Sequence, residues 1–593
     1  MLHDERDLSF GTLQSMTRWF LLCAAVGVIA GLAAIAFYWC MAVTEHFLLD
    51  GLAGYRPPGP GGEYPIMAAT ATPFRQWVLV FLPALGGLIA GILVFGIAPE
   101  AEGHGTDAVI EAYHKKGGHI RMRVPFVKAI ASAFVIGTGG SAGREGPVAQ
   151  IGAGFGSLLG RLFKLPPHER RVLMAAGMGA GIGAIFHAPL AGGLLAAEVL
   201  YRRMEFEHEV VVPSCIASIV AYALFATKFG WSPLFTSTPF VFHNIAELLP
   251  YFVLALVVAA GAVVYIRFFY WIRDRFKAWK IPNFLKPAVG GLVVGGIGFF
   301  LPQAMGTGYG FIQQGFEGHI GWQLLLAIAL GKIVTTAFSI GSGGSGGVFG
   351  PAVVIGGALG GMVGLLTQIF FPAIGVQPGA FMIVGMAGFF AAAANAPISM
   401  IIMISEMTGD YHLLVPSMWV CVIAYLLVRR SAIYEKQLES RIDAPYHLKE
   451  VMSEVLKRMT VKDAIDDPQH EPTQIIPEGM GIRELAERFA DSGHVSFPVV
   501  NQDGELLGIV NEEQTRLLIN DPEMAGLVVA GDISISLPVV TTNETLNSAM
   551  HKLASVRNAE VAVVDSKQPK KVIDTLGRVD LVRAYDQRVL GKE

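Results

Sequence analysis

The sequence predicts a polytopic α-helical membrane protein built from two related halves, followed by a soluble α+β region. The first observation is composition: the 593 residues are 53% hydrophobic and 16% charged, whereas soluble domains carry roughly 25% charged residues. The second is a break near residue 428, before which charges are sparse and after which they are frequent. The third is an internal repeat in the apolar part. We expect a cytoplasmic N-terminus over 1–18, a membrane domain over 19–440 and a cytoplasmic region over 441–593.

The apolar stretches of the membrane domain differ in length. Long ones occur at 19–42, 77–98, 211–228, 248–272, 284–301, 322–340 and 379–428. A simple transmembrane helix needs about 20 apolar residues, and the other stretches are shorter or interrupted by glycine and proline. We therefore expect broken or tilted helices whose ends meet inside the bilayer, where their backbone is buried in protein or lines a cavity. Charged residues before the first stretch fit a cytoplasmic start without a cleavable signal peptide.

Two glycine-rich runs carry the clearest functional signal. The chain reads GTGGSAGREGP over 137–147 and, 204 residues later, GSGGSGGVFGP over 341–351. Glycine leaves backbone amides uncovered, and proline suits the first turn of a helix. Each run therefore predicts a helix N-terminus whose amides face a ligand, and the positive end of a helix favours an anion.

The repeat continues beyond these runs at a nearly constant offset. Gly177 and Gly385, Met178 and Met386, Pro189 and Pro397, and Glu198 and Glu406 are each 208 residues apart. The membrane domain therefore divides into halves of about 75–205 and 280–430. Transporters built from such halves hold their substrate at the interface between them. Because Glu198 recurs as Glu406, we expect both to have a structural role, holding backbone amides or a basic partner.

Glu145 stands at the start of a predicted helix, beside the candidate anion site. A carboxylate there competes with a bound anion for the same amides and the same helix end. An ionisable group at membrane depth indicates function. We interpret Glu145 as a gate that occupies the pathway when charged and leaves it when displaced or protonated; the alternative is an interfacial glutamate paired with Arg144.

The region after residue 440 contains a smaller duplication. The segments 495–510 and 559–576 each alternate apolar and turn residues after a helical stretch. This pattern predicts an α+β regulatory module. The four cysteines show no metal or disulfide spacing, and neither a catalytic constellation nor a nucleic-acid motif stands out. We therefore expect a protein that is not an enzyme and needs no cofactor for its chemistry.

Three motifs resemble those of the CLC chloride channels and transporters with a C-terminal CBS pair. They are GREGP at 143–147, GVFGP at 347–351 and SEMTG at 405–409. The resemblance spans nearly the whole chain and places the CBS repeats at about 446–520 and 528–590. It implies inverted-topology halves and a homodimer with one chloride pathway per subunit. It further implies a multi-pass protein of a bacterial-type plasma membrane, with both termini in the cytoplasm.

The resemblance also implies roles for individual residues. The anion would be held by Arg144 and Gly146 of the first motif and by the backbone amides of Val348 and Phe349. Glu145 would be the external gate. The pore tyrosine of the family corresponds to Tyr434, whose hydroxyl would donate to a central anion; the alternative is an interfacial aromatic anchor.

Two positions depart from the family pattern. The serine of the family's anion loop is replaced by His104, followed by Gly105. The imidazole either donates to the anion or points away and leaves the ion to the backbone. Val199 occupies the position where family exchangers carry a proton-relay glutamate, and valine carries no proton. This favours a passive, gated chloride channel.

Other functions remain as alternatives. The first is a chloride/proton antiporter of the same fold that does not use a glutamate at Val199. A distant one is a CBS-regulated cation transporter, which the glycine-rich amide clusters argue against. In the CBS pair, Asp580 fits the position that contacts the ribose of an adenine nucleotide, but Gln514 stands there in the first repeat. We favour a nucleotide-free dimerisation module.

Overall fold

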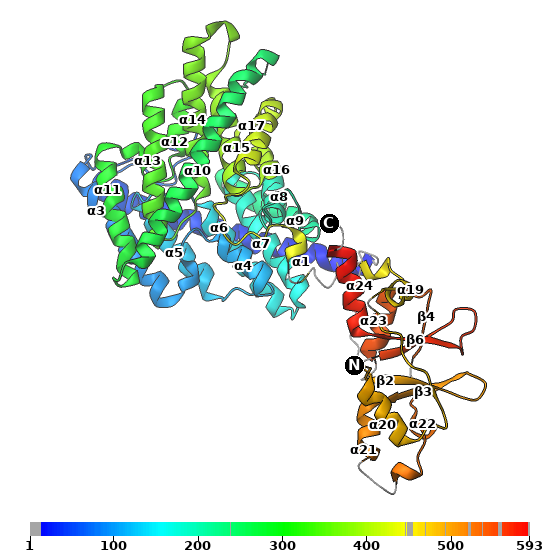
Figure 1. Cartoon of the computed structure of the whole chain (residues 1–593). Helices are drawn as coiled ribbons and strands as arrows, with labels where there is room; N and C mark the ends of the chain where they lie inside the picture. The colour runs from blue at the N-terminus through cyan, green and yellow to red at the C-terminus, as the bar shows by residue number, and fades with distance from the viewer. Residues whose placement is uncertain are drawn as a thin grey trace. The chain divides into compact units, whose positions relative to one another are not determined.

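The computed structural model describes residues 13–590 except 238, 243, 445, 447–454, 469, 493, 520–523, 537 and 556–559. The chain forms two compact units, Met1–Asp443 and Ala444–Glu593, shown in Figure 1. Residues 1–12 of the predicted N-terminal segment lie outside the described part.

The first unit consists entirely of helices and loops among its described residues. In the part of the chain that the structure describes, seven helical segments are long and apolar enough to cross a membrane. Their main helices are α1 (Leu13–Thr44), α3 (Gln76–Ile97), α9 (His208–Phe229), α10 (Leu248–Ala278), α11 (Lys286–Phe300), α13 (Trp322–Gly341) and α14 (Phe349–Phe370). α11 reaches this length together with the short helix Asn283–Leu285 directly before it. The other main helices are α4 (Thr106–Lys115), α5 (Arg123–Gly137), α6 (Glu145–Leu162), α7 (Pro167–Phe186), α8 (Pro189–Glu198), α12 (Tyr309–Phe316), α15 (Pro378–Ala394), α16 (Pro397–Thr408) and α17 (Leu414–Val428). This is the predicted polytopic architecture of long and broken helices.

The longest predicted apolar stretch, 379–428, is divided into α15, α16 and α17. The first break follows from local chemistry: Asn395 ends α15 in the left-handed conformation (φ 56°), and Pro397 begins the next helix. A left-handed residue ends a helix, and proline is accommodated in the first turn of another. The first half breaks in the same way, because His187 (φ 55°) ends α7 and Pro189 begins α8.

The two halves contact one another reciprocally through α8 and α16. Glu198, the last residue of α8, accepts hydrogen bonds from the first amides of α16, at Ile398 (3.1 Å) and Ser399 (2.7 Å). Glu406, near the end of α16, accepts them from the first turn of α8 at 3.2 and 2.8 Å. Each helix end therefore meets the start of the other, so the two helices run antiparallel. α8 and α16 are the equivalent helices of the two halves, and equivalent helices that run antiparallel are expected for repeats of inverted topology.

Close backbone packing explains part of the glycine content. A Cβ on Gly152 of α6 would lie 2.1 Å from the carbonyl oxygen of Gly177 in α7. The second half repeats this contact, because a Cβ on Gly356 of α14 would lie 2.4 Å from the Gly385 carbonyl oxygen in α15. The two helix pairs that begin at the glycine runs are thus held at backbone-contact distance.

The second unit contains two three-stranded sheets of the same topology. The first is β1 (Ile476–Pro477), β2 (Ser496–Val500) and β3 (Leu506–Asn511), and the second is β4 (Val540–Thr541), β5 (Glu560–Val564) and β6 (Val572–Gly577). In each, the first pair is parallel and the second antiparallel. Its helices include α19 (Val461–Ile465), α20 (Ile482–Asp491), α21 (Glu512–Ile519), α22 (Ala530–Ile533), α23 (Leu546–Ser555) and α24 (Arg578–Leu590). The sheets have separate hydrophobic cores, which confirms the predicted duplicated α+β region.

Candidate anion pathway

The two glycine runs lie side by side. Gly143 and Gly347 exchange backbone hydrogen bonds of 2.8 and 2.7 Å, directly before α6 and α14 begin. Gly103 pairs with the second run as well, because its amide donates to the Gly344 carbonyl (2.9 Å). The N-termini of α6 and α14, and the loop that precedes α4, therefore converge in one place. Helix N-termini are positive and carry unpaired amides, so this place favours an anion.

Glu145 occupies this place itself. One oxygen of its carboxylate accepts a hydrogen bond from the amide of Gly350 (2.6 Å) in the first turn of α14. The side chain is 4% exposed. A Cβ on Gly143 would lie 2.0 Å from this carboxylate and one on Gly347 2.4 Å. Glycine at both positions leaves the room that the Glu145 side chain fills.

A small cavity of about 10 Å³ adjoins Glu145, which is room for one water-sized particle. Residues from both halves line it: Thr106, Glu145, Gly146, Met178, Ile182, Phe186, Leu195, Val199, Phe349 and Tyr434. The structure thus brings five of the residues singled out in the sequence to one cavity, namely Glu145, Gly146, Val199, Phe349 and Tyr434. Thr106 also lines the cavity and was missed in the sequence; its place directly after Gly105, at the start of α4, is the signal that could have identified it.

His104 does not line this cavity. Its Nε2 lies 3.3 Å from a carboxylate oxygen of Asp107, and its ring packs beside Tyr434 at 5.3 Å between centroids. Gly105 precedes α4 with φ 85°, a conformation that favours glycine. Of the two orientations open from the sequence, the structure has the imidazole turned to Asp107.

Replacing His104 by serine should therefore have little effect on which anion is carried. We expect the preference of chloride over nitrate to change by less than about two-fold, as is usual for a side chain outside the site. Anion-substitution fluxes in reconstituted vesicles measure this preference. A large change in the ratio would place the imidazole on the ion instead.

Arg144 also points away from the cavity. Its guanidinium forms an ion pair with Glu63 and lies over the rings of Tyr38 and Tyr309, at 5.3 and 5.5 Å from their centroids. The alternative considered from the sequence, a pair between Arg144 and Glu145, is not what forms: the partner is Glu63. Nothing in the local motif indicates a partner 81 residues away.

Val348, at the N-cap position of α14, is also absent from the cavity lining, and its carbonyl accepts a hydrogen bond from Tyr265 (3.1 Å). Its neighbour Phe349 begins α14 and lines the cavity. Phe349 also packs against Phe186 and Phe390, with centroid distances of 4.7 and 4.3 Å. Aromatic side chains from both halves thus enclose this end of the cavity.

Two fully buried lysines support the loops around the site. Lys128 of α5 donates to the carbonyl oxygen of Gly103 (2.6 Å), and Lys332 of α13 donates to that of Gly306 (2.5 Å). Both side chains are 0% exposed. They are 204 residues apart, the offset of the glycine runs, and that spacing was the signal by which the sequence could have identified them.

Glu198 and Val199 have different surroundings although they are adjacent. The Glu198 carboxylate is taken up by the two amides of α16 described above, whereas the Val199 side chain lines the cavity. The Val199 carbonyl accepts a hydrogen bond from Gln437 (2.9 Å). The carboxylate of Glu198 is therefore directed at the start of α16, and the apolar side chain of Val199 is directed at the cavity.

In the second unit, Asp580 is engaged by protein groups. It accepts a hydrogen bond from the Gly577 amide (2.8 Å), and its other oxygen lies 3.1 Å from Nδ1 of His470. Nε2 of His470 lies 3.1 Å from Asp574. The two carboxylates raise the pKa of His470 above its usual value of 6.5. An imidazole that donates from both nitrogens is the charged form, so His470 holds these two aspartates together.

Replacing His470 by glutamine should loosen this part of the second unit at low pH. A raised pKa in the folded state gives stability that is complete below pH 6.5 and is lost as pH rises through the folded pKa. We expect the amides around Gly577 to exchange about five-fold faster in the variant at pH 6, equivalent to about 1 kcal/mol, and the difference to shrink towards pH 8. Hydrogen exchange of the full-length protein, compared with wild type at each pH, measures this. Equal exchange at pH 6 contradicts it.

Comparison with known proteins agrees with this geometry. The model of the voltage gated chloride channel family matches residues 86–429, and that of the CBS domain matches 453–514. The chain belongs to the voltage gated chloride channel family, the CLC proteins, and carries a CBS region. The family resemblance carried by the three motifs is confirmed, and so is the predicted fold class.

Individual relatives cover most of this chain. An H(+)/Cl(-) exchange transporter ClcA of Cronobacter sakazakii is 30% identical over 417 residues, 69% of this chain and 86% of its own. A ClcB-like protein of Ralstonia nicotianae, whose name is that of a chloride channel, is 29% identical over 412 residues, 68% of this chain and 92% of its own.

Solved structures show the same fold. A slow cyanobacterial Cl−/H+ antiporter has a TM-score of 0.62 at 22% identity, covering 70% of this chain and 96% of its own. A eukaryotic CLC transporter has a TM-score of 0.57 at 19% identity and covers 96% of this chain and 99% of its own. The second match includes the region after the membrane unit.

Proposed function

We propose that this protein exchanges chloride for protons, with Glu145 as the gate of the pathway. The observation that carries the proposal is the Glu145 carboxylate bonded to the Gly350 amide at the start of α14. A carboxylate in that position does what a bound anion would do there, because it satisfies the amide and the positive helix end. An anion and the charged side chain therefore compete for one place.

Proton binding then follows from the same competition. A protonated Glu145 has lost the charge that holds it at α14, so a chloride ion can take its place at the Gly350 amide and at the first turn of α6. When the carboxylate loses its proton, it returns and displaces the anion. Tyr434 and Thr106 line the adjoining cavity and supply hydroxyl donors for an ion that passes through it.

Exchange is favoured over the passive channel that Val199 alone suggested. Relatives at 30% identity, including the Cronobacter sakazakii protein, are named as H(+)/Cl(-) exchange transporters. Val199 excludes a carboxylate relay at that position, so protons reach Glu145 through the cavity by way of water and the hydroxyls of Thr106 and Tyr434. Glu198 is unsuited to replace the relay because both of its oxygens accept amide hydrogen bonds.

A passive, gated channel is the second candidate, and the apolar Val199 on the cavity is the observation in its favour. Reversal potentials separate the two functions. With fixed chloride gradients, an exchanger shifts its reversal potential when the pH gradient changes, whereas a chloride channel does not. We expect the shift.

The remaining assignments belong to the same proposal. We place the protein as a homodimer, with one pathway per subunit, in a bacterial-type plasma membrane with both termini cytoplasmic. In the CBS region, adenine nucleotide would have to displace His470 from Asp580, which favours a module that acts without nucleotide.

A further inference from the structure

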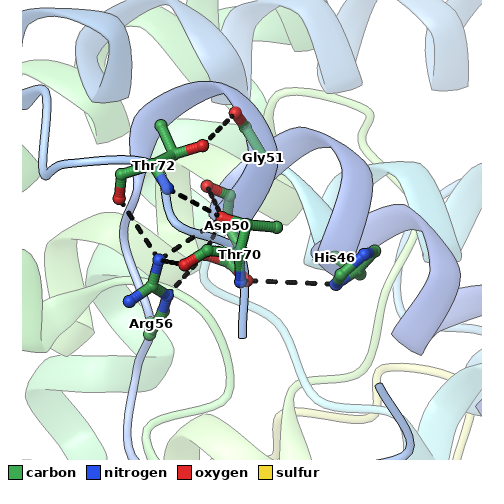
Figure 2. Close-up of polar contacts among 6 residues, drawn as sticks. All are labelled: His46, Asp50, Gly51, Arg56, Thr70 and Thr72. Carbon is green, nitrogen blue, oxygen red and sulfur yellow. Dashed lines mark hydrogen bonds and ion pairs between the residues drawn. The ribbon is translucent and has the colours of Figure 1, made fainter. Parts of the chain in front are cut away.

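The loop formed by residues 54–75 is fastened at its two ends. Asp50, at the end of the first transmembrane segment, accepts hydrogen bonds from Arg56 (2.5 Å) and from the amide and hydroxyl of Thr70 (both 2.8 Å). Thr72 donates to the Gly51 carbonyl (3.0 Å), and Arg56 donates to the Thr72 carbonyl (3.2 Å). Figure 2 shows Arg56 and Thr70 bonded to Asp50, and Thr72 bonded to Gly51 and Arg56 beside them. Both ends of the 54–75 loop are therefore hydrogen-bonded to Asp50 and Gly51, at the end of the first transmembrane segment.

The middle of the 54–75 loop lies against α12 and against the segment at Leu234. The Gly61 amide donates to Gln313 of α12 (3.2 Å), and the Gly62 amide donates to the Leu234 carbonyl (3.0 Å). A Cβ on Gly310 of α12 would lie 1.8 Å from the Pro58 carbonyl oxygen. Backbone of the loop thus touches α12 directly, next to Tyr309.

From this loop Glu63 reaches the arginine beside the gate. Its carboxylate forms the ion pair with Arg144 and also accepts a hydrogen bond from Tyr38 (2.9 Å). Arg144 is 2% exposed, so its charge is hidden from solvent beneath the loop. A buried guanidinium requires an anionic partner, and here the loop supplies it.

Two buried donors in the same cluster lack an acceptor. Among the described residues, neither Nε of Arg144 nor the hydroxyl of Tyr309 has a hydrogen-bond partner. The Tyr309 hydroxyl lies 2.5 Å from the position of a Cβ on Gly350, the residue whose amide binds Glu145. These donors therefore adjoin the proposed gate, and they belong to neighbouring side chains, because the guanidinium carbon of Arg144 lies 5.5 Å from the centre of the Tyr309 ring.

We propose that Arg144 and Tyr309 form a second anion site next to Glu145 beneath the 54–75 loop, and that the Glu63 carboxylate, which pairs with the Arg144 guanidinium, competes with the anion for that charge. The inference rests on the proposed function, since the anion is the transported chloride. A chloride ion that displaces Glu63 leaves the charge of Arg144 balanced. Glu63 thus sets how easily chloride reaches the gate from this side, and the fastened loop ends keep the carboxylate close enough to return.

The test compares Glu63→Gln with Glu63→Asp and with wild type. Glutamine keeps the size and the acceptor for Tyr38 but removes the competing charge, whereas aspartate keeps the charge. Glu484→Gln, at an exposed carboxylate on α20 of the second unit, is the matched control. The readouts are the half-saturating chloride concentration for flux in proteoliposomes and chloride binding to the purified protein by calorimetry.

We expect Glu63→Gln to lower the half-saturating concentration and the dissociation constant by about ten-fold, because a full charge has been removed within a few ångströms of the ion. Glu63→Asp and Glu484→Gln should stay near wild type. Unchanged chloride binding in a folded Glu63→Gln protein overturns the inference, as does an equal shift in Glu63→Asp. Wild-type protein that carries no chloride refutes the proposed function instead, while the binding measurement still tests Glu63.

Discussion

Replacing Glu145 by glutamine should leave chloride transport fast and uncoupled from protons. The amide is neutral at every pH, so it binds the first turn of α14 more weakly than the carboxylate and never titrates. Wild-type flux should rise on acidification, whereas flux through the variant should vary by less than about two-fold between pH 5 and pH 8 because the gate no longer titrates. Chloride efflux from proteoliposomes, measured with proton movement, gives both quantities.

Glu484→Gln serves as the control, because it makes the same chemical change at an exposed side chain of the second unit. It should retain both the pH dependence and the proton coupling of wild type. Proton coupling that persists in Glu145→Gln would remove Glu145 from the gate.

Replacing Glu198 by alanine should lower the stability of the membrane unit, because Glu198 has a structural role and does not transfer protons. The change leaves the amides of Ile398 and Ser399 unpaired in a site that is 0% exposed at Glu198. Each buried, unpaired amide costs about 1–3 kcal/mol. Glu406→Ala should have a similar effect, since Glu406 binds the start of α8 in the same way. Thermal unfolding in detergent, followed by tryptophan fluorescence, measures the loss.

Glu198→Gln separates this structural role from proton transfer. Glutamine keeps one acceptor oxygen but carries no titrating proton, so the number of protons exchanged per chloride should match wild type. A stable Glu198→Gln protein that has lost proton coupling would identify Glu198 as the relay and contradict the structural role.

The sequence predicted the fold because its repeat is local and regular. The glycine runs, 204 residues apart, and the four residue pairs 208 residues apart identified two halves and the helix ends that meet. It did not predict where 379–428 breaks, because apolar composition is continuous there and one left-handed Asn395 before a proline decides the break. Apolar composition predicts which segments are buried, whereas the position of a helix break is decided by single residues such as Asn395 and Pro397.

The site was predicted in part for a similar reason. Motifs brought Glu145, Phe349 and Tyr434 together, since each lies in a short recognisable pattern. Glu63 lies in a loop rich in glycine and proline, and its pairing with Arg144 depends on how that loop is folded back. A contact over such a separation leaves no local pattern. His470 escaped notice likewise, because its two aspartates lie more than 100 residues further along the chain.

Chloride-driven proton movement tests the central claim most directly. Proteoliposomes with high internal and low external chloride, equal pH on both sides and a weakly buffered external medium are opened to transport by a potassium shunt. An exchanger carries protons inward as chloride leaves, so the account predicts that the external medium becomes alkaline and that a protonophore collapses this change. Chloride efflux at an unchanged external pH would contradict the account, and the apolar Val199 would then mark a passive channel.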